Sequence, residues 1–145
     1  MRAVRCGNRG IKNFPVVWKY TLQNPTRRTH LPKFDRHIFV CTNQREPGAA
    51  RPSCNSDGKS RLHALLKDKL RAAKIPGTLR VNKAGCLDQC EHGQTIVVYP
   101  EQVWYGFVKP EDLDEIVEEH LRHGRPVERL RLKPECLNTS SCPHR

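Results

Sequence analysis

The chain has 145 residues, a formal net charge of +11 and seven cysteines. A chain of this length suits one compact domain with tails, and none of its apolar stretches approaches the roughly 20 residues that a bilayer span requires. The excess charge lies at the ends, because residues 1–30 carry seven Lys or Arg and no acid, whereas residues 37–124 carry twelve residues of each sign. A neutral centre argues against a nucleic-acid-binding domain, whose basic residues should line one folded face.

The two ends of the chain are predicted to be extensions of a central domain at residues 31–130. Residues 1–30 contain no Ser and no apolar run that would mark export, and we expect them to be disordered or not part of the native protein. Residues 131–145 are rich in Pro, Ser, Asn and Thr and are predicted to form a flexible tail. Cys6, Cys136 and Cys142 lie in these ends and are expected to be free, solvent-facing thiols of a cytoplasmic protein.

The first half of the central domain reads as a strand, a helix and a second strand. Residues 36–41 are β-branched and aromatic, which is typical of a strand. A helix is predicted from residues 58–60 to residue 74, capped by Ser60 or Asp57 and ended by Pro76 and Gly77. Residues 79–82 form the next strand. One face of the helix carries an apolar stripe of Leu62, Leu65, Leu66, Leu70 and Ala73.

The second half reads as a hairpin followed by a helix. Strands are predicted at residues 94–99 and 103–108, joined by a turn at residues 100–102. Pro110 opens the last helix and Gly124 ends it. The inward face of this helix is expected to carry Leu113, Ile116, Val117 and Leu121.

Four cysteines are spaced as the ligands of a thiolate-held metal centre. Cys41, Cys54, Cys86 and Cys90 give the pattern C-x12-C-x31-C-x3-C. A two-iron cluster needs two protein thiolates on each iron, four in all. Cys86 and Cys90 are four residues apart, which places both sulfurs on one side of a tight turn or short helix. Cys41 follows the first strand, and Cys54 ends a loop rich in Pro and Gly that is long enough to bring in the last thiolate.

The order and spacing of these motifs resemble the thioredoxin-like two-iron two-sulfur ferredoxins over residues 33–130. The matching segments are His37-Ile38-Phe39-Val40-Cys41-Thr42-Asn43, Ser53-Cys54, Gly85-Cys86-Leu87-Asp88-Gln89-Cys90, Val97-Val98-Tyr99-Pro100 with Val103-Trp104-Tyr105, and Pro110-Glu111-Asp112-Leu113-Asp114-Glu115-Ile116.

The resemblance implies an α/β chain with a thioredoxin-like fold, in which two main helices cover a mixed four-stranded sheet in the order β-α-β-β-β-α. It also implies one 2Fe-2S cluster per chain, protein redox partners and a homodimer. The expected function is one-electron transfer without catalysis, with Cys41, Cys54, Cys86 and Cys90 as the cluster ligands. The acids on the last helix are predicted to form a solvated surface, or else a docking patch for a basic partner.

Other kinds of site fit the residues less well. Structural zinc sites usually draw on two close cysteine pairs, and only Cys86 and Cys90 form one here. A Rieske centre needs two histidines, and although His92 lies near Cys90, no second histidine has matching spacing, so we expect no direct metal role for His92. Two alternative functions stay open: a structural zinc-binding interaction module, and an electron-transfer subunit of a larger dehydrogenase or hydrogenase assembly.

Overall fold

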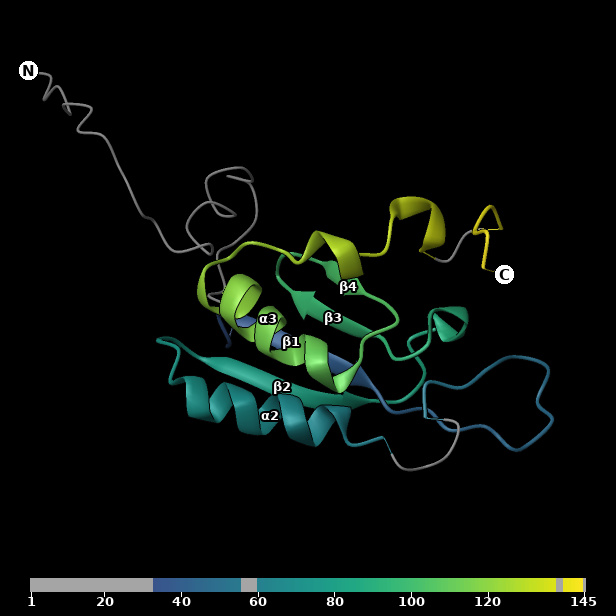
Figure 1. Cartoon of the computed structure of the whole chain (residues 1–145), viewed down its shortest axis with the longest axis horizontal. Helices are drawn as coiled ribbons and strands as arrows, with labels where there is room; N and C mark the ends of the chain where they lie inside the picture. Colours follow the sequence, from purple (N-terminus) through teal and green to yellow (C-terminus); the bar gives the residue numbers. More distant parts are fainter. Residues whose placement is uncertain (1–32, 56–59, 138–139, 145) are drawn as a thin grey trace, which may run out of the picture. The chain divides into compact units, whose positions relative to one another are not determined.

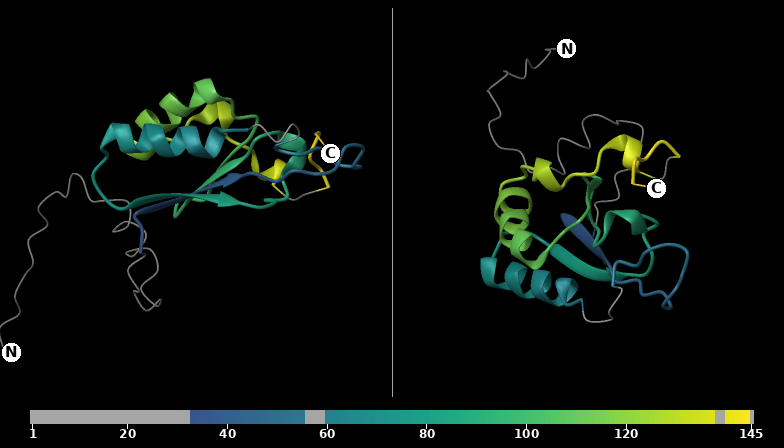
Figure 2. Two further views of the ribbon diagram at one scale, coloured as in Figure 1. Left: turned by 90° about the horizontal axis from the view of Figure 1, so that it is seen from below. Right: turned by 45° about the vertical axis from the view of Figure 1, so that its right-hand side comes forward.

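The structure is a computed structural model that describes residues 33–55, 60–137 and 140–144. The predicted extension at residues 1–30, with Cys6, and the predicted cap Asp57 lie outside these residues. The described part forms a four-stranded mixed sheet with two main helices on one of its faces (Figures 1 and 2). This arrangement confirms the predicted α/β fold with the element order β-α-β-β-β-α.

The sheet has the strand order β2-β1-β3-β4. Strand β1 (Arg36–Cys41) lies at the centre, pairs in parallel with β2 (Leu79–Ala84) and pairs antiparallel with β3 (Ile96–Tyr99). Strand β4 (Val103–Tyr105) completes the predicted hairpin beside β3. Strand β2 runs two residues beyond its predicted end, because pairing with β1 continues as far as Cys41 opposite Ala84.

Both hairpin strands are shorter than predicted. Phe107 adopts a positive φ of 54°, which is unusual for a bulky residue and takes the chain out of the extended conformation. Its amide N–H donates to the carbonyl of His92 instead of to a neighbouring strand, at an N–O distance of 2.6 Å. The chain after β4 therefore lies against the turn at His92, where tertiary contacts override the strand propensity of residues 106–108.

Helix α2 (Leu62–Ala73) packs its predicted stripe against the sheet. Leu62 and Leu66 are fully buried, and the other stripe residues are half-buried against the same core. The helix ends as predicted, with Lys74 in the left-handed conformation just before Pro76. At the start, the hydroxyl of Ser60 lies 3.5 Å from the amide nitrogen of Leu62, a long contact at the predicted cap.

The last helix is one helical segment of changing pitch. It runs through a 3₁₀ turn (Pro110–Asp112), helix α3 (Leu113–Glu115) and a π-helical stretch (Ile116–Arg122). The four residues predicted to face inward are buried in the core: Leu113, Ile116, Val117 and Leu121. Within the described residues, no helix is both long enough and apolar enough to cross a membrane.

The chain after this helix returns to the sheet. Arg131 forms a β-bridge with Tyr105, and the amide of Leu132 donates to the carbonyl of Trp104 at 2.8 Å. Gly106 lets this segment approach closely, because a Cβ there would lie 2.6 Å from the side chain of Leu132. Residues 130–132 therefore extend the sheet beyond β4.

The prediction that Cys136 and Cys142 face solvent is wrong. Their exposed fractions are only 8% and 5%. Cys136 ends a short 3₁₀ helix (Pro134–Cys136) that follows the bridge to β4. Composition suggested an unfolded tail, but backbone pairing at residues 130–132 brings the following cysteines against the folded domain.

Candidate metal centre

Strand pairing brings the first and third cysteines of the predicted set together. Cys41 ends β1 and lies opposite Ala84, the last residue of β2. Gly85 and Cys86 come directly after that strand, and the thiol of Cys41 donates to the carbonyl of Gly85 at 3.2 Å. Because β1 and β2 are parallel, their carboxyl ends meet at the same edge of the sheet, and the site is built there.

The loop after β1 brings Cys54 to the same edge. The amide of Asn55 and the hydroxyl of Ser53 both donate to the carbonyl of Asn43, at 3.1 and 2.7 Å. These bonds close the loop at its base, so its final residues return to the end of β1. The Cys54 thiol is buried and donates to the carbonyl of Gly93 at 2.8 Å.

Cys86 and Cys90 share one tight turn. Their sulfurs are 3.6 Å apart, and the amide of Asp88 lies 3.4 Å from the sulfur of Cys86. Asp88 has a φ of 56°, which reverses the chain between the two cysteines. A 3₁₀ turn (Cys90–His92) follows. The four-residue spacing thus places both sulfurs on one side of the turn, as predicted.

The four sulfurs form two pairs instead of one compact group. The thiols of Cys41 and Cys54 are close enough for each to change the pKa of the other, and Cys86 and Cys90 form the second pair. Among the residues that the structure describes, no three of these four sulfurs all lie within 4.8 Å of one another. A single zinc ion would draw four sulfurs to within about 3.8 Å of one another, whereas a two-iron cluster takes two thiolates at each end. The geometry fits the two-iron cluster.

Hydrogen bonding and burial act on the protonation of these thiols. Interaction with the thiol of Cys54 lowers the pKa of Cys41 to about 6, and the same interaction raises the pKa of Cys54. Burial raises the pKa of Cys90, while Arg45 acts in the opposite direction. Because Cys41 has the lower pKa, it is the thiol of its pair that loses its proton first. This matters for the site because metals bind cysteine as the thiolate.

Arg45 supplies positive charge beside the second pair. One terminal nitrogen of its guanidinium lies 3.2 Å from the sulfur of Cys90 and 3.6 Å from the sulfur of Cys86. The Nε of Arg45 and the side-chain amide nitrogen of Asn43 are buried donors without an acceptor among the described residues. Inorganic sulfide and thiolate sulfur are acceptors, so these donors suit an anionic cluster held beside them.

A network of ion pairs holds the loop against the turn. Arg51 binds Asp88 and Glu91, each at 2.7 Å. Arg51 precedes Cys54 by three residues, and the two acids lie between and just after Cys86 and Cys90. These contacts join the segments that carry three of the four cysteines.

Solvent reaches the site from one side. Cys41, Cys54 and Cys90 are buried, whereas Cys86 is exposed. The residues beside Cys86 at Gly85 and Asp88 are exposed as well. A redox centre held here would be shielded over most of its surface and would approach a partner at the Cys86 end.

Ion pairs within the chain neutralise most of the acidic face of the last helix. Arg129 binds both Asp112 and Glu115, Arg122 binds Glu118, Arg125 binds Glu119, and Lys69 binds Asp114. A patch that attracts a basic partner needs uncompensated negative charge. Little uncompensated negative charge therefore remains on this face to attract a basic partner, which argues against the predicted docking role.

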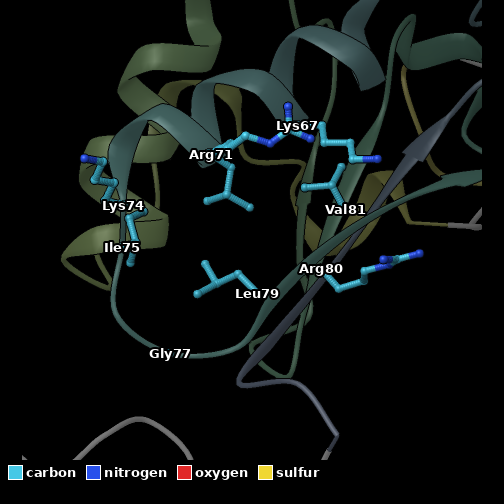
Figure 3. A pocket seen from close by; sticks show the side chains of 9 residues that line it. Lys67, Arg71, Lys74, Ile75, Gly77, Leu79, Arg80 and Val81 are labelled. Atoms are coloured by element: carbon cyan, nitrogen blue, oxygen red, sulfur yellow. The ribbon is translucent and has the colours of Figure 1, made fainter.

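A pocket between α2 and β2 lies away from the cysteines. Its cavity of about 320 Å³ is lined by cationic and aliphatic side chains, including Lys67, Arg71, Lys74, Leu79 and Arg80 (Figure 3). Leu79 begins β2, and the cysteines gather beyond the other end of that strand. This pocket is separate from the metal centre.

Sequence reasoning missed a second group of ligand side chains. His92, Cys136 and His144 each place one ligand atom within 4.8 Å of the others. The only signal in the sequence was the presence of two cysteines and a histidine within nine residues of the tail, from residue 136 to residue 144. The missing partner, His92, lies far earlier in the chain.

Comparisons with known proteins agree with the fold and with a 2Fe-2S cluster. The chain is 44% identical over 96 residues to a 2Fe-2S ferredoxin of Aquifex aeolicus (strain VF5), a match that covers 66% of this chain and 86% of that protein. It is 38% identical over 96 residues to a 2Fe-2S ferredoxin of Clostridium pasteurianum, covering 66% of this chain and 94% of that protein.

A solved structure is also similar. The crystal structure of the wild-type thioredoxin-like [2Fe-2S] ferredoxin from Aquifex aeolicus matches with a TM-score of 0.63 at 42% identity, over 68% of this chain and 96% of that one. No family model matches the chain.

Proposed function

The chain belongs to the thioredoxin-like [2Fe-2S] ferredoxins, and on that premise we propose that Cys41, Cys54, Cys86 and Cys90 hold its cluster. The protein is an electron carrier with one 2Fe-2S cluster per chain. The observation that supports this ligand set is the division of the four sulfurs into two close pairs, since each iron takes two thiolates. When bound, the cluster accepts and donates one electron at a time.

The residues around the cysteines prepare and tune the site. Arg45 donates to the sulfurs of Cys86 and Cys90 and offsets their negative charge. A cation at this distance stabilises the reduced state, which carries one more negative charge than the oxidised state, and so raises the reduction potential. Arg51 holds the loop that carries Cys54 against the turn of the second pair.

Partner docking is proposed at the Cys86 end of the site. Ferredoxins work with protein redox partners, and an exposed thiolate gives the shortest route from the cluster to the surface. Electron transfer is the only role that we assign to these residues, and no catalytic residue is proposed. The partner contacts the exposed loop residues around Cys86 in this proposal, with the acidic face of the last helix outside the interface.

We also propose the location and organisation of the chain. Six cysteines of the described residues are not in disulfides, which suits a reducing, cytoplasmic compartment. Residues 31–130 are proposed as the cluster domain, with residues 1–30 and 131–145 as extensions at its ends. The homodimer implied by the family resemblance stays a prediction, and sedimentation of the purified protein tests it.

The visible absorbance of a cysteine variant tests the ligand set. Serine at Cys41 and Cys90 removes one thiolate from each pair, and the purified variant should lose the visible absorbance of the cluster. Retention of that absorbance would overturn the ligand assignment. A colourless native protein with zinc on these four cysteines would instead support an interaction module, and co-purification with dehydrogenase or hydrogenase chains would support a subunit role.

A further inference from the structure

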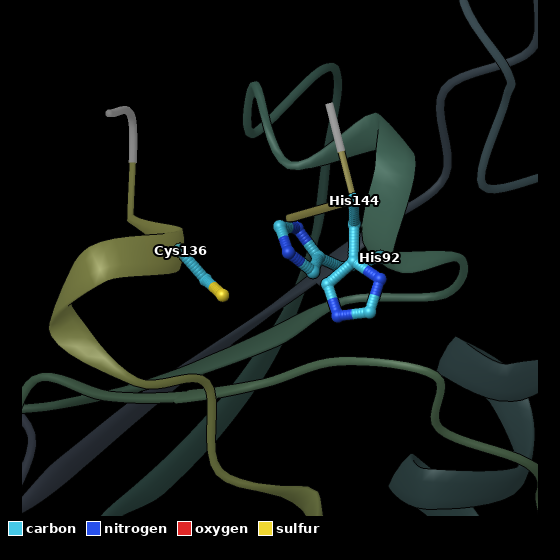
Figure 4. A group of neighbouring side chains, drawn as sticks. All are labelled: His92, Cys136 and His144. Atoms are coloured by element: carbon cyan, nitrogen blue, oxygen red, sulfur yellow. The ribbon is translucent and has the colours of Figure 1, made fainter. Parts of the chain in front are cut away.

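A second group of metal-ligand side chains lies beside the cluster turn. His92, at the end of the 3₁₀ turn that begins with Cys90, is only 1% exposed. Cys136, at the end of the short helix in the C-terminal segment, and His144 complete a group whose ligand atoms lie within 4.8 Å of one another. In Figure 4 the sulfur of Cys136 points toward the two imidazole rings.

Cys142 offers a fourth ligand atom beside this group. Its sulfur lies 3.3 Å from Nε2 of His92, and its thiol hydrogen-bonds with that of Cys136. We use the name tail site for these four residues: His92, Cys136, Cys142 and His144. Two imidazoles and two thiols are a ligand set found in structural zinc sites.

Two distances in the tail site match those around a tetrahedral zinc ion. With Zn–S near 2.3 Å and Zn–N near 2.0 Å, a tetrahedron places a sulfur and a nitrogen ligand about 3.5 Å apart, and two ring centroids about 5.2 Å apart. The sulfur of Cys142 is 3.3 Å from Nε2 of His92, and the ring centroids of His92 and His144 are 5.3 Å apart. The ligand atoms of His92, Cys136 and His144 lie within 4.8 Å of one another, and zinc would draw them to within about 3.5 Å.

The charge and burial of the tail site also suit zinc. Two thiolates and two neutral imidazoles around Zn²⁺ give a neutral unit, which can be buried at little electrostatic cost. His92, Cys136 and Cys142 are buried, and the exposed His144 lies on the solvent side. Four protein ligands fill the coordination sphere, as in structural zinc sites, and leave no open position for catalysis.

The backbone delivers these residues to one place. Residues 130–132 are fixed along β4 by the bridge at Tyr105 and the bond from Leu132 to Trp104. Phe107 then packs its ring edge-to-face against both His92 and His144, at centroid distances of 5.7 and 5.4 Å. These contacts therefore hold His92 and the C-terminal segment close to each other without any bond between the ligand side chains.

We propose that His92, Cys136, Cys142 and His144 bind a structural zinc ion that fastens the C-terminal segment to the turn carrying Cys90. The zinc site is separate from the four cysteines assigned to the iron cluster, and it shares one 3₁₀ turn with them through His92. Two alternatives need no metal. A hydrogen bond between a thiol and an imidazole would involve only one histidine, and a disulfide between the two cysteines would involve none. The convergence of two histidines on the cysteines favours the metal.

Zinc analysis of the full-length, cluster-loaded protein tests the proposal. The protein is purified anaerobically in the presence of micromolar zinc, dialysed, and assayed for iron and zinc. We expect about one zinc beside about two irons per chain, and a zinc-edge X-ray absorption spectrum with about two sulfurs near 2.3 Å and two nitrogens near 2.0 Å. Iron does not interfere with measurement at the zinc edge.

Variants separate the tail site from the cluster. Replacement of Cys136 and Cys142 together by Ser should lower zinc at least about tenfold and leave iron unchanged, which also shows that the variant folds. His144→Gln should remove one nitrogen from the zinc shell. His123→Gln, at an exposed histidine after the last helix, is the matched control and should retain both metals.

Three results would overturn the proposal. The first is native protein that holds iron but retains no zinc after the zinc treatment. The second is zinc that persists in the Cys136→Ser, Cys142→Ser variant, because that zinc would lie elsewhere. The third is a disulfide between Cys136 and Cys142 in the intact mass of protein purified under reducing conditions.

Discussion

The cluster site and the tail site use the same kinds of side chain but are assembled differently. At the cluster site, the ends of two parallel strands and one tight turn bring the cysteines to one edge of the sheet. At the tail site, a segment beyond the last helix must fold back to meet His92, which is 50 residues before Cys142. Sequence spacing can therefore indicate a site such as the cluster site, whereas a site such as the tail site becomes visible only in the folded structure.

The arrangement of the ligand atoms supports a different proposed metal at each site. The four cluster cysteines form two pairs without a common centre, which suits two irons joined by sulfide. At the tail site, the ligand atoms of His92, Cys136 and His144 lie within 4.8 Å of one another and the sulfur of Cys142 lies 3.3 Å from Nε2 of His92, which suits the one zinc ion proposed there. The following predictions are ordered from the largest expected effect to the smallest.

Exchanging cysteines should separate the two sites most sharply. In a variant with Ser at Cys41 and Cys90, we expect iron to fall at least about tenfold, because each iron has lost a ligand. The matched variant with Ser at Cys136 and Cys142 should keep its iron and its visible spectrum. Equal loss of iron from both variants would remove the distinction between the sites.

Loss of the cluster should destabilise the fold more than loss of zinc. With the proposed ligands the cluster would join β1, its loop and the turn after β2, so its removal should lower the melting temperature by about 10 °C or more. Removal of zinc should have a smaller effect, because the tail site fastens only the segment beyond β4. Circular dichroism melts of the loaded, zinc-free and fully metal-free protein measure both effects, and equal melts for the loaded and cluster-free protein would contradict the structural role of the cluster.

Gly106→Ala should disturb the tail site selectively. A Cβ at this position would lie 2.6 Å from Leu132 and 3.0 Å from the Cβ of His92. We expect a loss of about 1 to 3 kcal/mol in the free energy of unfolding, as for other overpacked sites, together with weaker zinc retention. Urea unfolding measures the stability, and metal analysis should show unchanged iron. Loss of iron with retention of zinc would contradict this prediction.

Arg45→Gln should make the cluster harder to reduce without removing it. The guanidinium lies 3.2 Å from the sulfur of Cys90, and its loss should lower the reduction potential by an amount on the order of tens of millivolts. Arg71→Gln, on the exposed side of α2, is the control and should leave the potential unchanged. Redox titration followed by visible absorbance gives both values, and the same potential in the two variants would mean that Arg45 does not tune the cluster.

Much of the fold could be read from local patterns. The stripe that begins at Leu62 predicted α2, the β-branched run before Cys41 predicted β1, and Pro110 marked the start of the last helix. Each of these signals is a periodicity or a turn residue that acts over a few positions. The bounds of β2 and β4 were less accurate, because pairing with β1 and the contact of Phe107 with His92 set them.

The site shows the same division between local and long-range information. The spacing of Cys86 and Cys90 and the family resemblance pointed to all four cysteines. Arg45 and the tail site could not be predicted in this way. The contact of Arg45 with sulfur depends on how the loop folds, and the burial of Cys136 depends on the bridge between Arg131 and Tyr105. Tail composition predicted exposure, and long-range backbone pairing overrode it.

The central claim is that the four cysteines bind two irons, and one measurement tests it most directly. Anaerobically purified protein is analysed for iron and acid-labile sulfide, and its dithionite-reduced form is studied by low-temperature electron paramagnetic resonance. We predict about two irons, two sulfides and one unpaired spin per chain, with all three lost in the Cys41→Ser, Cys90→Ser variant. Protein without iron and sulfide, or a full spin signal in that variant, would contradict the account.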